Sequence, residues 1–314
     1  MSRIHEALKR AEQERSAGNP GQPVERRTDA RAKSSAVETA PSPSAVVTRP
    51  TMSAVGAAHV KPEIAPSPIK FDELWEQCSR REWNPDLNLI VFGGSTPFTP
   101  GAEQFRTLRS RLYRMRETQP LQTILISSAI PAEGKTVVSS NLAYALVRQQ
   151  GCRVLLIDAD LRSPRVHTLL GTPAAPGLAD YLQETATEFQ IAQRSSEENF
   201  CFIPAGNHVT HPSELISSDR MKQFLERVKP AFDWIIIDSP PALPVADASV
   251  LGGLVDGVLL VVRANSTPSE ASVKACKELR DAHILGVVLN SAEESAGYNS
   301  YYASGYGATY GGKK

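Results

Sequence analysis

The chain has few cysteines, no long apolar run and no net charge. The four cysteines among 314 residues form no C-x-x-C pair, which argues against a zinc or iron–sulfur site and is typical of a reducing compartment. No apolar run approaches the length of a membrane-spanning helix, and the N-terminus lacks the apolar core of a signal peptide. Lysine and arginine total 34, as do aspartate and glutamate, so binding to nucleic acid is not expected. The sequence predicts a cytoplasmic protein that reaches a membrane only through a partner.

The N-terminal part is expected to lie outside the folded domain. Residues 1–15 are predicted to form a short amphipathic helix, with apolar residues three and four positions apart on one face. Such a helix is marginally stable alone, so it is either a solvated chain end or a docking helix for a partner protein. Residues 16–68 hold eight prolines and are rich in Ala, Ser and Thr, which predicts a disordered linker.

Residues 69–291 alternate between short apolar runs and helical patterns. This alternation predicts an α/β domain with a mostly parallel sheet flanked by helices. The expected strands are residues 87–92, 121–126, 153–158, 232–238, 257–262 and 285–290, and residues 203–206 are expected to end a further strand. The expected helices are residues 71–77, 101–115, 137–146, 212–228 and 269–282.

The stretch from Leu121 to Asn141 has the order strand, loop, helix. Its loop follows the pattern G-x-x-x-x-G-K-[ST], except that Ala129 replaces the first glycine. Unpaired backbone N–H groups and the helix dipole attract phosphate at such a helix start. A strand-to-helix turn that contains Gly-Lys-Thr by chance is the alternative, and the downstream motifs disfavour it. The predicted nucleotide-binding residues of this loop are Ala129, Pro131, Ala132, Glu133, Gly134, Lys135, Thr136 and Val137.

Two further apolar runs end in carboxylates. Asp158 and Asp160 follow the run that starts at residue 153, and Asp238 ends the run that starts at residue 232. Ligands of parallel sheets lie at the carboxyl ends of the strands, so these side chains are expected to face the phosphates. One strand that ends in aspartate is unremarkable, but two of them downstream of a Gly-Lys-Thr loop indicate a nucleotide site.

The predicted helix 101–115 carries Glu103, Arg106 and Arg109 at intervals of three. Residues spaced by three share a helix face. An ordinary charged surface explains the spacing, and so does a subunit contact made by one carboxylate and two guanidinium groups.

The C-terminal segment 292–314 is predicted to be flexible and rich in tyrosine. Five of the eight tyrosines lie in the last 17 residues, surrounded by Gly and Ser, so they cannot form a core. Low-complexity aromatic sequence is one interpretation. A phosphorylatable tail also explains why the abundant side chain is one with an acceptor hydroxyl. The candidate acceptors are Tyr298, Tyr301, Tyr302, Tyr306 and Tyr310.

Three segments together resemble the bacterial protein-tyrosine kinases (BY-kinases), the CpsD/CapB-type cytoplasmic autokinases of exopolysaccharide and capsule biosynthesis. Residues 127–136, 154–164 and 235–241 are similar to that family's Walker A motif, second aspartate-bearing motif and Walker B motif. The Glu-x-x-Arg-x-x-Arg helix is similar to its ring-forming motif, and the tyrosine cluster to its autophosphorylation site. The resemblance covers roughly residues 87–314.

This resemblance implies a P-loop NTPase fold and a tyrosine autokinase that uses ATP and Mg²⁺. Lys135 would contact the β- and γ-phosphates, and Thr136, Asp158 and Asp238 would hold the magnesium ion. Asp158 and Asp160 would lie near the γ-phosphate, with Asp158 favoured to take the proton of the acceptor tyrosine.

The resemblance also implies partners. Asn290 matches a position that meets adenine in the wider ATPase group. Phosphorylation in trans would occur within a ring-shaped homo-oligomer held by Glu103, Arg106 and Arg109. A transmembrane chain-length determinant (polysaccharide co-polymerase) would activate the kinase at the inner face of the cell membrane, and a tyrosine phosphatase would reverse its action. The outcome would be control of polysaccharide chain length and export.

Two other functions fit parts of the pattern. A MinD/ParA-type ATPase switch would cycle nucleotide without phosphorylating protein, but such switches carry a further lysine early in the loop, where this chain has none before Lys135. An adaptor that keeps the fold without the chemistry would not require the intact Lys135, Thr136, Asp158 and Asp238.

Overall fold

The computed structural model of the chain describes residues 67–92, 99–195 and 199–292. The predicted N-terminal helix, nearly all of the predicted linker and the tyrosine cluster lie outside these residues and stay predictions. No helix in the described ranges is long and apolar enough to cross a bilayer.

The elements are α2 (Phe71–Gln77), β1 (Ser79–Arg80), α3 (Pro100–Arg116), β2 (Thr123–Ser128), α4 (Lys135–Val147), β3 (Val154–Asp158), α5 (Val166–Leu170), α6 (Leu178–Leu182), α7 (Glu188–Ile191), β4 (Gln193–Arg194), β5 (Phe200–Ile203), α8 (Pro212–Ile216), α9 (Asp219–Val228), the 3-10 helix η1 (Lys229–Ala231), β6 (Trp234–Asp238), α10 (Asp247–Gly252), β7 (Gly257–Arg263), α11 (Ser269–Glu278) and β8 (Ile284–Asn290).

The described strands form one eight-stranded sheet in the order β1-β4-β5-β3-β6-β2-β7-β8. Neighbouring strands are parallel except for β4 and β5, which are antiparallel. Every residue of β2, β3 and β6 is buried, as expected for central strands covered on both faces. The prediction of a mostly parallel α/β sheet flanked by helices is therefore confirmed.

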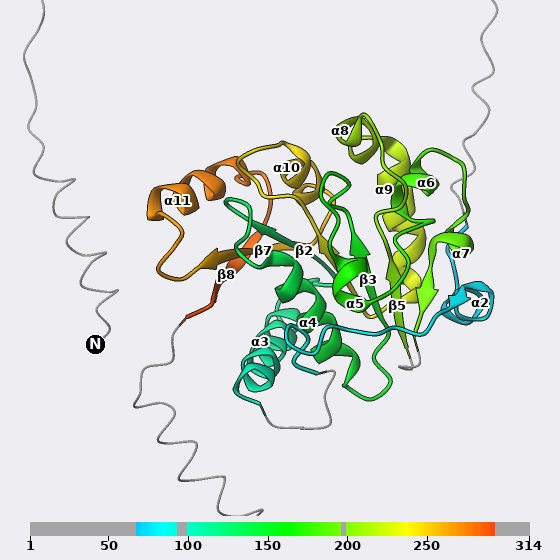
Figure 1. Cartoon of the computed structure of the whole chain (residues 1–314), viewed down its shortest axis with the longest axis horizontal. Coiled ribbons are helices and arrows are strands. Elements are labelled where there is room, and N and C mark those ends of the chain that lie inside the picture. The colour runs from blue at the N-terminus through cyan, green and yellow to red at the C-terminus, as the bar shows by residue number, and fades with distance from the viewer. Residues whose placement is uncertain (1–66, 93–98, 196–198, 293–314) are drawn as a thin grey trace, which may run out of the picture. The chain divides into compact units, whose positions relative to one another are not determined.

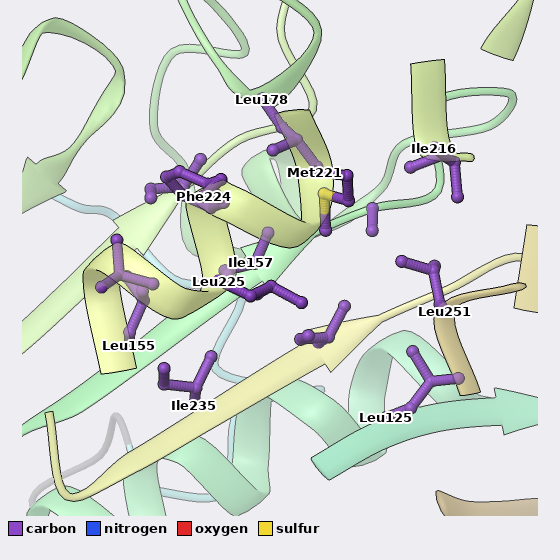
Figure 2. Close-up of a cluster of buried hydrophobic side chains, with 14 of the residues drawn as sticks. Leu125, Leu155, Ile157, Leu178, Ile216, Met221, Phe224, Leu225, Ile235 and Leu251 are labelled. Carbon is purple, nitrogen blue, oxygen red and sulfur yellow. The ribbon is translucent and has the colours of Figure 1, made fainter. Parts of the chain in front are cut away.

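Helices cover both faces of the sheet (Figure 1). On one face, α3 and α4 contribute Leu112 and Leu142 to a buried apolar cluster shared with the strands. On the other face lies α9, and Figure 2 shows its Phe224 and Leu225 beside Ile157 of β3. These two cores hold the central strands rigidly, so the loops at their carboxyl ends have a fixed base.

The three strands that carry the sequence motifs are neighbours in space. β6 lies between β3 and β2, with Asp158 aligned to Asp238 and Ile126 of β2 also aligned to Asp238. The loop that follows β2 and the carboxylates that end β3 and β6 therefore meet at one edge of the sheet, as the sequence predicted.

The predicted strand at residues 87–92 is wrong, because this segment is a series of turns. The Asp86 side chain accepts a hydrogen bond from the Asn88 backbone N–H at 2.9 Å, and the Asp86 carbonyl accepts one from Ile90 at 2.8 Å. Such local bonds favour turns. Asn141 of α4 then accepts from the Val91 N–H at 2.8 Å, a role that a strand neighbour would have.

The single helix predicted over residues 212–228 is two helices, α8 and α9. Ser218 has an extended backbone, with φ −71° and ψ 149°, and therefore ends helical geometry between them. Its hydroxyl donates to the Leu215 carbonyl at 2.6 Å, which satisfies a group at the end of α8. The sequence Ser-Ser-Asp at this point is typical of a helix start, although the apolar periodicity continues through it.

Candidate nucleotide-binding site

The loop between β2 and α4 has the geometry of a phosphate-binding loop. Gly134 directly precedes α4 with φ 90°, and Ala132 has φ 66°. The left-handed backbone at Gly134 suits glycine, which has no Cβ. The first N–H groups of α4 have no partner within the helix and carry partial positive charge. The loop therefore presents backbone donors to an anion.

Ala129, which replaces the first glycine of the pattern, is compatible with this fold. It is fully buried in the core, and it is not among the residues with positive φ. Its carbonyl accepts a hydrogen bond from the Leu243 N–H at 3.3 Å. The backbone at this position requires no glycine, and Ala129 packs in the core rather than lining the pocket.

Glu133 connects the loop through hydrogen bonds to residues near the end of β7. Its side chain is buried, and one carboxylate oxygen accepts from the Ile130 N–H at 2.8 Å. The other accepts from the N–H of Arg263, the last residue of β7, and from the hydroxyl of Thr267, which follows that strand. Asn290 adds a bond from its side-chain amide to the Glu133 carbonyl at 2.8 Å. Glu133 and Asn290, predicted as nucleotide contacts, thus hold the loop in shape.

Lys135 is the cation at the centre of the site. Its ammonium lies 2.8 Å from Asp160 Oδ2 and 3.7 Å from Asp238 Oδ2. Burial favours the neutral amine, but Asp238 and Asp160 outweigh burial and raise the pKa of Lys135. The lysine is therefore charged at neutral pH and can exchange its carboxylate partner for a phosphate.

Asp238 and Thr136 are arranged as magnesium ligands. The Thr136 hydroxyl donates to Asp238 Oδ2 at 2.8 Å. Asp238 Oδ1 is buried and has no hydrogen-bond partner among the described residues. Burial raises the pKa of Asp238, although Lys135 and Thr136 oppose the rise. A hard cation such as Mg²⁺ would satisfy the free carboxylate oxygen, and Mg²⁺ is ordinarily held by one or two carboxylates together with substrate phosphates. These residues fit that ion.

Asp158 has a different environment, since both of its oxygens are occupied by the backbone. Oδ1 accepts from the Asp160 N–H and Oδ2 from the Val166 N–H, each at 3.1 Å. Burial raises the pKa of Asp158 well above its usual range, and the nearby Asp238 adds to this rise. The Asp158 carboxylate thereby fixes the loop that carries Asp160.

A pocket of about 710 Å³ opens above these groups. Five predicted loop residues line it together with Lys135 and Asp160, whereas the other predicted residues do not. The five are Pro131, Ala132, Gly134, Thr136 and Val137, and those that do not line it are Ala129, Glu133, Asp158, Asp238 and Asn290.

Sequence reasoning gave Arg162 no role, yet it lines this pocket. Its Nε donates to Asp247 Oδ2 at 2.8 Å and its Nη2 to the Ser213 hydroxyl at 2.7 Å. Asp247 begins α10, and Ser213 lies in α8. Arg162 thus joins the loop after β3 to two helices, and only its spacing two residues after Asp160 hinted at a role.

The residues predicted for subunit contact lie on α3, away from the pocket lining. Glu103 forms an ion pair with Arg106 of the same chain. The Arg109 guanidinium donates to the Ala145 carbonyl of α4 at 2.7 Å. Arg109 therefore connects the predicted contact face with the helix that begins at the phosphate-binding loop.

The contacts of Glu133 generate a prediction about loop stability. In Glu133→Gln an amide NH₂ replaces one carboxylate oxygen and faces a backbone or hydroxyl donor, which leaves a buried donor unpaired. We expect a loss of about 1 to 3 kcal/mol in the free energy of unfolding, measured with urea. ATP affinity is expected to fall by about three- to tenfold, on the scale where 1.4 kcal/mol is tenfold.

Thr267→Val is the matched control, since it removes one donor to Glu133 and keeps the side-chain volume. Its loss of stability is expected to be the smaller of the two, about 0.5 to 1.5 kcal/mol. An effect of Glu133→Gln no larger than that of Thr267→Val would contradict the assigned role of the carboxylate.

Known proteins are similar to this chain in sequence and in fold. Residues 122–272 match a family described as an AAA domain. The tyrosine-protein kinase YwqD of Bacillus subtilis is 36% identical over 207 residues, which are 65% of this chain and 87% of YwqD. The tyrosine-protein kinase Etk of Escherichia coli is 36% identical over 69% of this chain, which spans only 30% of Etk.

A solved structure of the Etk kinase domain has the same fold. It superposes with a TM-score of 0.63 at 31% sequence identity and covers 73% of this chain and 89% of that domain. The enzyme class expected from the sequence is thus confirmed at the level of the family, and the P-loop fold with it. The chain belongs to the bacterial tyrosine-protein kinases.

Proposed function

We propose that this chain transfers the γ-phosphoryl group of ATP to tyrosines of its own C-terminal tail. The observation that carries the proposal is the site itself: a lysine at the start of α4 lies against Asp160 and Asp238, beside a pocket with room for a nucleotide. The family membership agrees with it. In the transfer, the tyrosine oxygen bonds to the γ-phosphorus as the bond to the β–γ bridging oxygen breaks, which yields ADP and phosphotyrosine.

The residues of the chain then have distinct roles. Lys135 and the backbone donors of the loop hold the phosphates and stabilise negative charge as it moves toward ADP. Thr136 and Asp238 would hold Mg²⁺, which supplies charge neutralisation when bound. Asp160 lines the pocket, so we assign it the phenol proton. Asp158, whose oxygens are bonded to the backbone, orients that loop.

We further propose the cellular setting that the family resemblance implies. The chain acts in the cytoplasm at the inner face of the membrane, where a transmembrane polysaccharide co-polymerase activates it and a tyrosine phosphatase resets it. Subunits assemble through α3 and phosphorylate one another's tails. Each phosphate adds about −1.5 to −2 charges, so a modified ring loosens by repulsion. The cycle regulates the chain length and export of an extracellular polysaccharide.

Mass spectrometry of the tail tests the kinase proposal. Incubation with Mg-ATP is expected to place phosphate on Tyr298, Tyr301, Tyr302, Tyr306 or Tyr310. Lys135→Met, which loses the central cation, is expected to remain unmodified when incubated alone. When isotopically labelled Lys135→Met is mixed with the unlabelled wild type, the labelled tails are expected to gain phosphate in trans. ATP turnover without phosphotyrosine would instead indicate a hydrolytic switch.

Sedimentation velocity tests the proposed assembly. In the Lys135→Met background, which keeps the tails unmodified, the chain is expected to sediment as a ring. Arg106→Glu reverses a charge on the proposed contact face and is expected to shift the population to monomer. Arg111→Glu, at an exposed position of the same helix, is the control and should keep the ring. A monomer in the Lys135→Met background, or a ring that survives Arg106→Glu, refutes the α3 interface.

A further inference from the structure

The pocket is larger than a phosphate site, and it extends away from the loop. Beyond Lys135 and Thr136 it reaches Leu89, the proline-rich loop after β6 and the segment that carries Arg162 and Arg165. Asn290, which the family resemblance places near adenine, does not line it. This outer part of the pocket therefore lies where an acceptor would approach the terminal phosphate.

Three cationic side chains line the pocket, and they differ in what neutralises them. Lys135 is paired with Asp160 and Asp238, and Arg162 with Asp247. The exposed side chain of Arg165 has no ion pair or hydrogen bond with any residue in the described ranges. Arg165 is thus the pocket cation left available to a ligand.

The backbone at Arg165 is nevertheless well fixed. On one side the Ser163 N–H donates to Asp160 Oδ1 at 3.0 Å, and on the other the Val166 N–H donates to Asp158 Oδ2 at 3.1 Å. The Arg165 carbonyl accepts from Leu169 at 3.1 Å at the start of α5. The carboxylates of Asp158 and Asp160 therefore hold the backbone from which the Arg165 side chain projects, while the guanidinium itself is free to reorient.

The remaining carboxylate that lines the outer pocket is Asp86. Its Oδ1 accepts from the backbone N–H of Asn88 at 2.9 Å and from the Asn88 side-chain amide at 3.0 Å. Asp86 forms no ion pair with Arg165 among the described residues, so the Arg165 guanidinium is available to an anionic ligand at this end of the pocket. Guanidinium binds phosphate through two parallel hydrogen bonds, and more strongly than it binds neutral groups.

We propose that Arg165 binds the phosphate of a tail tyrosine that is already modified, while a neighbouring tyrosine occupies the inner pocket as acceptor. This inference rests on the proposed function. The five tail tyrosines follow one another at intervals of one, three or four residues. An extended chain spans about 14 Å over four residues, so a modified neighbour stays close to each new acceptor. A partly phosphorylated tail is then a better substrate than an unmodified one.

Peptide kinetics test this inference. Two synthetic peptides of residues 293–314 are compared, one unmodified and one with phosphotyrosine at Tyr302 alone. For the wild-type chain, we expect the KM of the phosphopeptide to be about three- to tenfold lower, since a phosphate–guanidinium contact adds to binding. In Arg165→Gln the ratio of the two KM values is expected to be about one. Arg280→Gln, an exposed arginine outside the pocket, is the control and should retain the wild-type ratio.

Several results would overturn the inference. Equal KM values for the two peptides with the wild type would do so, as would a retained difference in Arg165→Gln. A rise in the KM for ATP, or equal rises for both peptides, in Arg165→Gln would assign the arginine to the nucleotide or to the carboxylates of the tail instead.

Binding measurements separate this inference from the proposed function. If the wild type transfers phosphate to neither peptide, the kinase proposal fails. Fluorescence anisotropy of labelled phosphopeptide then tests whether Arg165 binds the phosphate. Weaker phosphopeptide binding by Arg165→Gln than by Arg280→Gln supports the assigned contact, and equal binding refutes it.

Discussion

The site depends on the burial of three carboxylates around one lysine. Asp158, Asp160 and Asp238 lie at the carboxyl edge of the sheet, at most 3% exposed, and Lys135 is the cation among them. Burial of a charged group is costly unless an opposite charge or hydrogen bonds compensate it. Here backbone donors satisfy Asp158 and the lysine satisfies Asp160, but one oxygen of Asp238 has no partner among the described residues. The three carboxylates carry more negative charge than Lys135 neutralises, and a magnesium ion would supply the missing positive charge.

The fold makes this concentration of charge possible. β3, β6 and β2 are adjacent, and apolar clusters on both faces hold them. Burial of these strand ends is the main cause of the raised pKa values of Asp158 and Asp238, and repulsion from the neighbouring carboxylates adds to the rise. A site with this excess of buried negative charge on a fixed sheet edge is suited to bind a cation and a nucleotide.

Much of this site could be predicted from sequence because its main elements are local. The Gly-Lys-Thr turn and the carboxylates at two strand ends are contiguous patterns, and parallel strands bring such ends together. The loop support could not be predicted in the same way. From the sequence, Glu133 is predicted to be a loop residue near the phosphates. Its hydrogen-bond partner Thr267 lies 134 residues further along the chain, so the local pattern does not reveal the contact.

The errors in secondary structure have the same origin. The apolar run 87–92 looks like a strand, but its backbone groups bond to Asp86 and to the Asn141 side chain. The helix over residues 212–228 is interrupted because Ser218 is extended, which the apolar periodicity does not reveal. In both cases polar contacts that the apolar pattern does not reveal determine the local structure.

The most direct test of this excess negative charge is the magnesium dependence of ATP affinity. It is measured by calorimetry in the wild type and in Asp238→Asn. The account predicts that magnesium tightens ATP binding to the wild type by about tenfold or more, equivalent to about 1.4 kcal/mol, and that Asp238→Asn loses most of this gain. A variant that keeps the full magnesium effect would contradict it.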